Sequence, residues 1–253
     1  MARKPAIAQE TLRPSGADVD YATTVLSTEV HLINARLEQV FKSAVDDGHS
    51  KNLGGVTAAI YAFLDYDHEP IYVGQTRDRV STRVRRHLTG MRSDSVAKSV
   101  LDPFEVRYLV VWPLEWLRHQ DALELKAELN AFEATVHDVL IEKSEHGGLL
   151  NEGGVRGNGA RRHLPEPLEF DIIPEAVFKE RSHPDIRLAR RAQTIANLAR
   201  HISERDVSAG LRRALDTQSA RLALLARQRL DGLKIEKGGL AFPPAPDEEG
   251  VGL

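Results

Sequence analysis

Two tyrosines, an arginine, a histidine and a glutamate follow one another in this chain at spacings that suit phosphodiester chemistry. Tyr61 and Tyr72 lie in two short apolar segments. Arg83 and His87 are one helical turn apart, and Glu133 stands on a later amphipathic segment. Hydrolysis of a phosphodiester needs an activated water, a cation near the charge that grows on the phosphoryl group, and help for the departing oxygen. These side chains supply the required types.

Local patterns place the two tyrosines on a β-hairpin. Residues 57–64 (TAAIYAFL) and 71–74 (IYVG) are rich in apolar, β-branched and aromatic residues, and the polar segment 65–70 joins them. We therefore expect two antiparallel strands with a short loop. With a four-residue loop, Tyr61 would lie directly opposite Tyr72, and both hydroxyls would project from one face of the sheet.

A short basic helix is expected directly after this hairpin. Gly74 is expected to end the second strand, where the backbone can turn or approach a phosphate closely. Residues 81–88 (STRVRRHL) predict a helix with Ser81 as its N-cap. Arg83 and His87 lie on one face of it because they are four residues apart. Such a basic pair is usually a solvated surface, but its position after the tyrosine strand favours a functional site.

Two further elements complete the predicted framework. Residues 105–111 (EVRYLVV) predict a third strand, and the apolar residues of 121–143 recur every three or four positions, as in a helix. Glu128 and Glu133 lie on opposite flanks of that apolar stripe, so the helix alone does not choose between them. The sequence predicts an α+β fold with a small three-stranded, mainly antiparallel sheet flanked by helices.

The order and spacing of these residues resemble the nuclease module of the GIY-YIG superfamily. Ala59-Ile60-Tyr61 and Tyr72-Val73-Gly74 resemble the two triplets that name the superfamily, and the matching residues that follow are Arg83, His87, Glu133 and Asn151. The resemblance covers about residues 55–155. It departs where Ala59 replaces a glycine, where one extra residue precedes Arg83, and where a long gap separates Glu133 from Asn151.

The resemblance implies a metal-dependent DNA endonuclease and a role for each matching residue. It favours Glu133 over Glu128 as the ligand of one Mg²⁺ or Mn²⁺ ion. It assigns Arg83 to the charge of the transition state and Tyr61 to activation of the water. Tyr72 would position the phosphate or the water, and His87 would orient the tyrosine or take its proton, so the division of labour stays open. The asparagine, Asn151, would close the module and support the site by hydrogen bonding.

Within this superfamily we expect a type II restriction endonuclease that leaves 5′-phosphate and 3′-hydroxyl ends. The region 104–111 resembles the third strand of restriction enzymes of this type, and no zinc finger or repair appendage is recognisable. A structure-selective or weakly specific nuclease of phage defence, mobile DNA or repair is the first alternative. A module that binds DNA without cutting is the second.

The rest of the chain is expected to form helical extensions and a tail. Residues 1–54 include an amphipathic segment, 21–45, that would pack on the sheet or form part of a DNA clamp. The nuclease module is assigned to residues 55–160 and a basic helical region to residues 161–237. Residues 238–253 are rich in proline, glycine and acids, which predicts a disordered tail.

Charge is distributed unevenly along the chain. The formal net charge is −3, yet residues 181–230 contain eleven arginines, no lysine and four acids. Clustered arginine on helices is typical of contact with a phosphate backbone, although such helices equally often pair with acids of their neighbours. The glycine-rich loop 152–159 is a further candidate DNA contact. The candidate DNA-binding residues are Arg79, Arg86, Arg156, Arg161, Arg162, Arg190 and Arg191.

Composition limits the remaining function classes. The absence of cysteine excludes disulfides and zinc-thiolate sites. No apolar stretch is long enough for a membrane span, and the first residues lack a signal-peptide core. We therefore expect a cytoplasmic, bacterial protein whose partner is double-stranded DNA, and a homodimer if the DNA site is symmetric.

Overall fold

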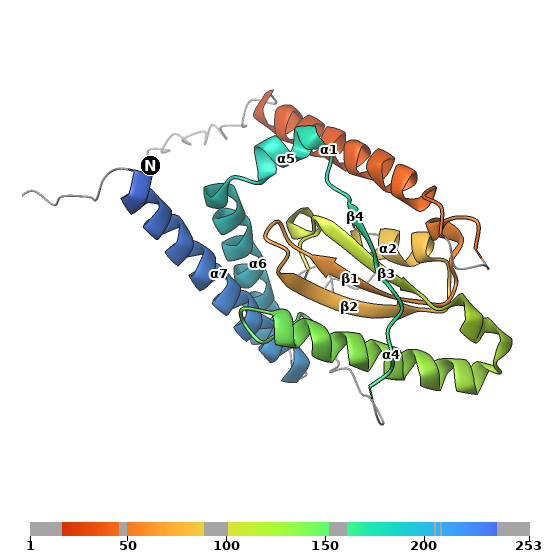
Figure 1. Ribbon diagram of the computed structural model, residues 1–253. Helices are drawn as coiled ribbons and strands as arrows, with labels where there is room; N and C mark the ends of the chain where they lie inside the picture. The colour runs from red at the N-terminus through yellow and green to blue at the C-terminus, as the bar shows by residue number, and fades with distance from the viewer. Residues whose placement is uncertain are drawn as a thin grey trace, which may run out of the picture.

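The computed structural model describes residues 17–45, 50–88, 101–151, 161–204, 206–207 and 209–236. The fold is α+β and is built around an antiparallel sheet of four strands in the order β2-β1-β3-β4 (Figure 1). The strands are β1 (Ala59–Leu64), β2 (Pro70–Thr76), β3 (Tyr108–Pro113) and β4 (Leu168–Asp171). The first three were predicted. The fourth was missed, and it places part of the sheet beyond the expected module boundary at residue 160.

The register of the β1–β2 hairpin differs from the predicted one. Tyr61 lies opposite Gly74, and Tyr72 lies opposite Phe63, so the expected direct pairing of the two tyrosines is wrong. The pairing is irregular between Phe63 and Leu64. Because the change amounts to two residues, both tyrosines still share one face of the sheet.

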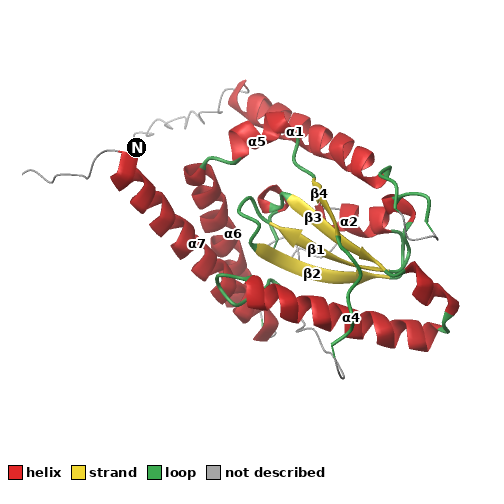
Figure 2. Ribbon diagram, in the orientation of Figure 1, coloured by secondary structure: helices red, strands yellow, loops and turns green. Residues whose placement is uncertain are grey.

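The sheet separates two apolar cores. Tyr61 and Phe63 face the core that includes side chains of α1 (Ala17–Phe41) and α2 (Val80–Leu88). Ile60 and Ala62 face the other core, which is covered by α4 (Ala122–Lys143). Figure 2 shows the sheet with α1 and α4 on opposite sides of it. Successive side chains of β1 therefore point in turn toward the core with α1 and α2 and toward the core with α4.

The predicted helices are confirmed, with corrections at their ends. The helix α4 begins after Asp121, whose carboxylate accepts hydrogen bonds from the backbone N–H groups of Leu123 and Glu124 at 2.8 and 2.9 Å. The helix α2 begins at Val80. Ser81 is not its N-cap, because its hydroxyl donates to the carbonyl of Gly54 at 2.9 Å.

Three short 3-10 segments connect these elements, namely η1 (Leu53–Gly55), η2 (Pro103–Glu105) and η3 (Glu115–His119). The carboxylate of Glu115 accepts from the backbone N–H groups of Thr57 and of Ala58, the latter at 2.8 Å. These bonds tie η3 to the start of β1, so the link between β3 and α4 has a fixed position.

Three C-terminal helices pack against the hairpin turn: α5 (Glu175–Arg181), α6 (Pro184–Glu204) and α7 (Ala209–Glu236). Helices α6 and α7 lie side by side as an antiparallel pair (Figure 1). Asp65 in the β1–β2 turn accepts from Arg191 at 2.9 Å and from Arg221 at 2.7 Å, and Arg187 lies 3.5 Å away. Much of the positive charge of this region is therefore used inside the fold.

The N-terminal helix packs on the sheet, which confirms one of its two predicted roles. Leu37, Val40 and Phe41 of α1 are buried in the same core as Tyr61. The glycine-rich loop with Arg156 and the predicted tail at 238–253 lie outside the described residues.

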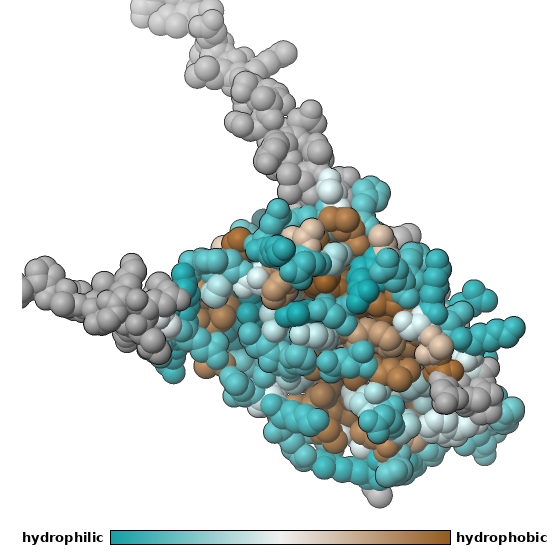
Figure 3. Space-filling model, turned by 45° about the horizontal axis from the view of Figure 1, so that its top comes forward, coloured by the Kyte–Doolittle hydropathy of each residue, from teal (hydrophilic) through white to brown (hydrophobic). Residues whose placement is uncertain are grey.

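The visible surface mixes hydrophilic and hydrophobic side chains. On the face in Figure 3, hydrophilic side chains surround several hydrophobic patches. Large exposed apolar residues include Trp116 on η3, Leu123 on α4 and Leu230 on α7. Among the described residues, no helix combines the length and the apolar character that crossing a bilayer would require.

Candidate active site

Tyr61, His87 and Arg83 form a hydrogen-bonded group on the α2 face of the sheet. The hydroxyl oxygen of Tyr61 lies 2.8 Å from Nε2 of His87. The same oxygen accepts a hydrogen bond from Nε of Arg83 at 3.2 Å. The side chain of Tyr61 is fully buried and that of His87 nearly so, whereas Arg83 is half-buried. The structure thus brings these three candidate residues together.

Gly74 makes room for the Tyr61 hydroxyl. A Cβ atom at position 74 would lie 2.5 Å from the hydroxyl oxygen of Tyr61 and 2.7 Å from its Cζ. Gly74 lies inside β2 and does not end the strand, which corrects the sequence expectation. A glycine is required here because any side chain would occupy the place of the phenol.

The electrostatic surroundings keep the Tyr61 phenol protonated. Burial raises the pKa of Tyr61 far above its usual value, and the neighbouring Tyr72 raises it further. Arg83 lowers the pKa of Tyr61 through its charge and its hydrogen bond, but only in part. Such a phenol acts in proton transfer only if it releases its own proton while it accepts another. Nε2 of His87, 2.8 Å away, can serve as the acceptor in the tautomer that leaves this nitrogen unprotonated.

Tyr72 is the more accessible tyrosine of the group. Its ring centroid lies 6.3 Å from that of Tyr61 and 5.1 Å from that of His87, and it stacks on Phe63 at 6.0 Å. Tyr72 is half-buried while Tyr61 is fully buried. Of the two phenols, Tyr72 is therefore the one that solvent or a ligand reaches first.

Glu133 is positioned by a side chain of β2. Nε2 of Gln75 donates to Oε2 of Glu133 at 2.9 Å and to Oδ1 of Asn130 at 2.6 Å. Burial raises the pKa of Glu133, while the hydrogen bond from Gln75 and the charge of Arg83 lower it. The influence of Arg83 shows that this carboxylate belongs to the same electrostatic neighbourhood as the tyrosine group.

Glu128, the alternative carboxylate on α4, is used elsewhere. Its two oxygens accept from Nε and Nη2 of Arg162 at 3.0 and 2.8 Å. These hydrogen bonds lower the pKa of Glu128. Because Glu128 is held by Arg162 and Glu133 by Gln75, the structure favours Glu133 as the carboxylate of the site.

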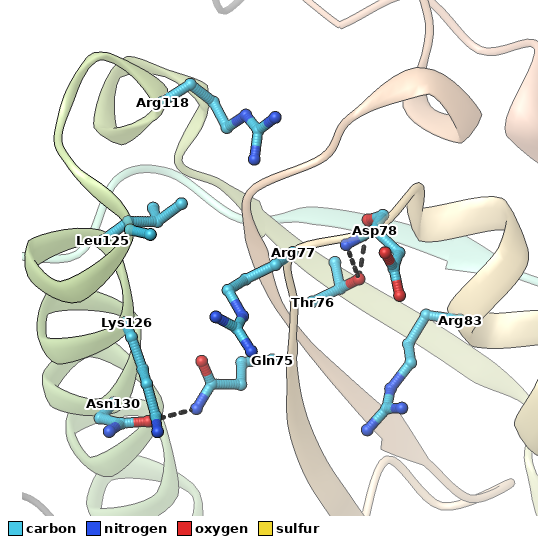
Figure 4. A pocket seen from close by; sticks show the side chains of 10 residues that line it. Gln75, Thr76, Arg77, Asp78, Arg83, Arg118, Leu125, Lys126 and Asn130 are labelled. Carbon is cyan, nitrogen blue, oxygen red and sulfur yellow. Dashed lines mark hydrogen bonds between the residues drawn. The ribbon is translucent and has the colours of Figure 1, made fainter.

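A cleft of about 440 Å³ lies between the β2–α2 connection and the η3–α4 segment, and Arg83 and Gln75 connect it to the tyrosine group and to Glu133. We call it the β2–α4 cleft. Gln75 lines it from β2, Asn130 from α4 and Arg83 from α2 (Figure 4). Because β2 is an edge strand, side chains from both faces of the sheet reach this one opening.

Asn151 supports β2 from outside the sheet, as predicted. Its Oδ1 accepts from the backbone N–H of Val73 at 3.2 Å, and its Nδ2 donates to the carbonyl of Val73 at 2.8 Å. The neighbouring Leu150 donates its N–H to the carbonyl of Ile71 at 2.8 Å. Asn151 thus fixes the strand segment between Tyr72 and Gly74.

The candidate DNA-binding arginines fall into two groups. Arg79 and Arg86 are exposed beside and on α2. Arg161 pairs with Glu142, Arg162 with Glu128 and Arg190 with Asp102, so acids of this chain already neutralise them. The prediction for Arg191 is wrong, because this side chain is 5% exposed and donates to Asp65 and Glu105.

Sequence reasoning missed several residues of the site. Gln75 donates to the Glu133 carboxylate and to Asn130, while Arg77, Arg118 and Lys126 line the cleft. One signal was available, because Lys126 and Asn130 precede Glu133 by seven and three residues and so share its helix face. Gln75 was missed because its position depends on the register of the β1–β2 hairpin, and the predicted register was wrong.

The donor atoms near Glu133 suit a hard divalent cation. Within the described ranges, no three residues of the types His, Asp and Glu gather into a ready metal cage. The site offers one carboxylate and the neighbouring amide oxygens of Gln75 and Asn130. Mg²⁺ typically binds proteins through one or two carboxylates and keeps several waters, so this oxygen set fits Mg²⁺ or Mn²⁺ better than zinc.

Comparison of the chain with protein-family models, with curated proteins and with solved structures gives no match. The functional interpretation therefore rests on the geometry of the residues themselves.

Proposed function

We propose that this protein is a metal-dependent DNA endonuclease of the GIY-YIG type that hydrolyses phosphodiester bonds to 5′-phosphate and 3′-hydroxyl ends. The observation that carries the proposal is the group formed by Tyr61, His87 and Arg83, which lies beside the cleft that Glu133 approaches through Gln75. Together with Glu133, the group would provide a proton path, a cation and a carboxylate for a metal ion.

The proton path runs through the buried phenol. The attacking water loses a proton to the oxygen of Tyr61 while the Tyr61 proton moves to Nε2 of His87, 2.8 Å away. The phenol stays neutral throughout, which its raised pKa requires. Tyr72, the more accessible phenol, positions the water or a phosphate oxygen. The proton from the water stays on Tyr61, and the original Tyr61 proton ends on His87.

Arg83 faces the charge that develops on the phosphate. Its Nε is occupied by the Tyr61 hydroxyl, which fixes the direction of the guanidinium. The other guanidinium nitrogens are available to donate to phosphoryl oxygens from the wall of the β2–α4 cleft. Arg83 therefore connects the proton path with the phosphate in one rigid arrangement.

Glu133 would hold one Mg²⁺ or Mn²⁺ ion, oriented by the hydrogen bond from Gln75. Such an ion supplies Lewis acidity at the phosphoryl oxygens. The task of the chain is to keep the carboxylate ionised and directed at the cleft. The charge of Arg83 and the donor of Gln75 both favour the ionised form.

We further propose that the enzyme is a type II restriction endonuclease that acts on double-stranded DNA as a homodimer. The test is incubation of purified protein with unmethylated phage DNA and Mg²⁺, with EDTA as the control. Discrete metal-dependent fragments support restriction. Smears, or cutting of branched DNA alone, would replace restriction by a structure-selective nuclease, and binding without cutting on any DNA would leave a binding module.

Matched variants make this test specific. Arg83→Ala and Glu133→Gln are expected to abolish cleavage while DNA binding persists. Glu128→Gln is the control on the same helix, because Glu128 pairs with Arg162 and should leave cleavage unchanged. Cleavage by Glu133→Gln but not by Glu128→Gln would show that the metal ligand is wrongly assigned.

A further inference from the structure

The β2–α4 cleft carries cations that the proposed cleavage chemistry does not use. Arg77 follows β2, Arg118 lies on η3 and Lys126 lies on α4, and all three line the cleft together with Arg83 (Figure 4). Asp78 is the acid among the lining residues. Three separate elements thus bring an excess of positive charge to one opening.

These cations differ in their partners from the arginines that form ion pairs within the fold. Arg162, Arg190 and Arg229 each form an ion pair with an acid of the chain. Arg77, Arg118 and Lys126 form no hydrogen bond or ion pair with any residue in the part of the chain that the structure describes. Unpaired cations around a concave site raise the local concentration of anions. The cleft is therefore suited to an anionic ligand.

The cations are held on fixed elements. Arg118 lies on η3, which Glu115 ties to the start of β1 through two backbone N–H groups. Lys126, Asn130 and Glu133 recur along one face of α4 at intervals of four and three residues. These residues form a wall of the cleft, and its cations have fixed positions relative to the Glu133 carboxylate.

The length of this wall matches a short run of phosphates. The seven residues from Lys126 to Glu133 span roughly 10 Å of helix. A strand of duplex DNA carries one phosphate per roughly 3.4 Å of axis and winds around that axis, so the wall spans at most about three phosphates. Arg118 precedes α4 and extends the positive wall beyond Lys126.

We propose that the β2–α4 cleft binds the sugar-phosphate backbone of the cut strand beside the scissile phosphate, through Arg77, Arg118 and Lys126. This assignment rests on the proposed nuclease function, since it takes the phosphate at Arg83 as the reacting one. The cleft fixes the position of the strand and reads no bases, because phosphate contacts carry no sequence information directly.

The experiment is a salt titration of DNA binding by the full chain. Fluorescence anisotropy of a labelled DNA duplex in EDTA gives Kd without cleavage, between about 50 and 200 mM salt. The variants are Arg118→Ala, Lys126→Ala and their combination, with Arg118→Lys as the variant that keeps the charge. The control is Arg227→Ala, an exposed arginine of α7 that does not line the cleft.

Each lost phosphate contact should reduce the slope of log affinity against log salt by about 0.9 and weaken binding roughly threefold to tenfold. Arg118→Lys and Arg227→Ala should keep the wild-type slope. If the double variant keeps the wild-type slope while the wild type still cuts DNA, the cleft assignment is wrong and the nuclease proposal stands. A wild type that binds through the cleft but cuts no DNA overturns the nuclease proposal and the assignment to a cut strand, and leaves the cleft as a site for a DNA backbone.

Discussion

The Tyr61 hydroxyl lies between a proton acceptor and a cation, 2.8 Å from Nε2 of His87 and 3.2 Å from Nε of Arg83. The side chain of Tyr61 is fully buried, whereas Arg83 is half-buried and lines the β2–α4 cleft. Arg83 only donates, so the Tyr61 proton can move to an acceptor such as Nε2 of His87 but not to Arg83.

Removal of the Tyr61 hydroxyl should slow cleavage while the aromatic ring stays packed in the core. Tyr61→Phe keeps the ring and deletes the oxygen that joins Arg83 to His87. We expect single-turnover cleavage to slow by about a hundredfold or more. The free energy of unfolding should fall by about 1–3 kcal/mol, because two buried polar groups lose a partner. An unchanged cleavage rate, with the fall in stability present, would remove Tyr61 from the proton path.

Addition of one methyl group at Gly74 should disturb the same hydroxyl. The new Cβ would lie 2.5 Å from the Tyr61 oxygen, so Gly74→Ala should destabilise the fold by about 1–3 kcal/mol and stop cleavage. The matched control is Gly232→Ala in α7, where the added atom meets nothing within 4 Å. This control should gain about 0.5–1 kcal/mol of stability, since alanine favours helix. Urea unfolding measures both, and equal effects would contradict the close approach.

Gln75 should control metal affinity through Glu133. Gln75→Ala removes the donor that orients the carboxylate, and loss of such an outer partner typically weakens metal binding about 10- to 100-fold. Titration with Mn²⁺, with the free ion followed by electron paramagnetic resonance, measures this without DNA. Glu128→Gln should bind Mn²⁺ like the wild type. Equal Mn²⁺ affinity in Gln75→Ala and the wild type would mean that Gln75 does not position the ligand.

The buried carboxylate of Asp65 should contribute far more to the free energy of unfolding than an exposed carboxylate does. Asp65→Asn leaves Arg221 buried without its carboxylate partner, while Arg191 keeps Glu105, and this should cost about 3–5 kcal/mol of unfolding free energy. Asp185→Asn, which faces Arg229 at the surface, should cost much less, because water screens this pair. Urea denaturation of both variants gives the comparison. Similar small losses would show that the arginine cluster is solvated in solution.

His137 on α4 should make the fold less stable in mild acid. Burial lowers the pKa of His137 below its usual 6.5, although Asp138 opposes this. As pH falls through about 6.5, the unfolded chain binds a proton that the folded chain refuses, so the free energy of unfolding falls. Urea midpoints at about pH 7.5 and 5.5 should therefore differ less for His137→Gln than for the wild type. An identical pH dependence would contradict the lowered pKa.

Local patterns predicted the helices well because each signal is contained in a few residues. The apolar spacing of α4 lies within the segment that it defines. The segment 81–88 likewise coincides with α2 apart from its first residue. The fourth strand was missed because Leu168–Asp171 is short and half-exposed, so neither length nor alternation distinguishes it.

Long-range pairing decided what the sequence did not show. The irregular pairing at Phe63 shifted the hairpin register, and with it the partner of Tyr61. Gln75 became a site residue only because this register and the position of α4 bring it to Glu133. The arginines of α6 posed the same problem, since Arg191 finds Asp65 across 126 residues of sequence. The clustered arginines predicted an anionic partner. They did not show that this partner is a carboxylate of the same chain.

The two hydrogen bonds between Asn151 and Val73 also bear on how the protein behaves at high concentration. β2 is an edge strand, and an open edge invites pairing with a strand of another molecule. The amide of Asn151 occupies both backbone groups of Val73, and the N–H of Leu150 occupies the carbonyl of Ile71. A residue that steadies the site thereby also blocks self-association along the strand next to it.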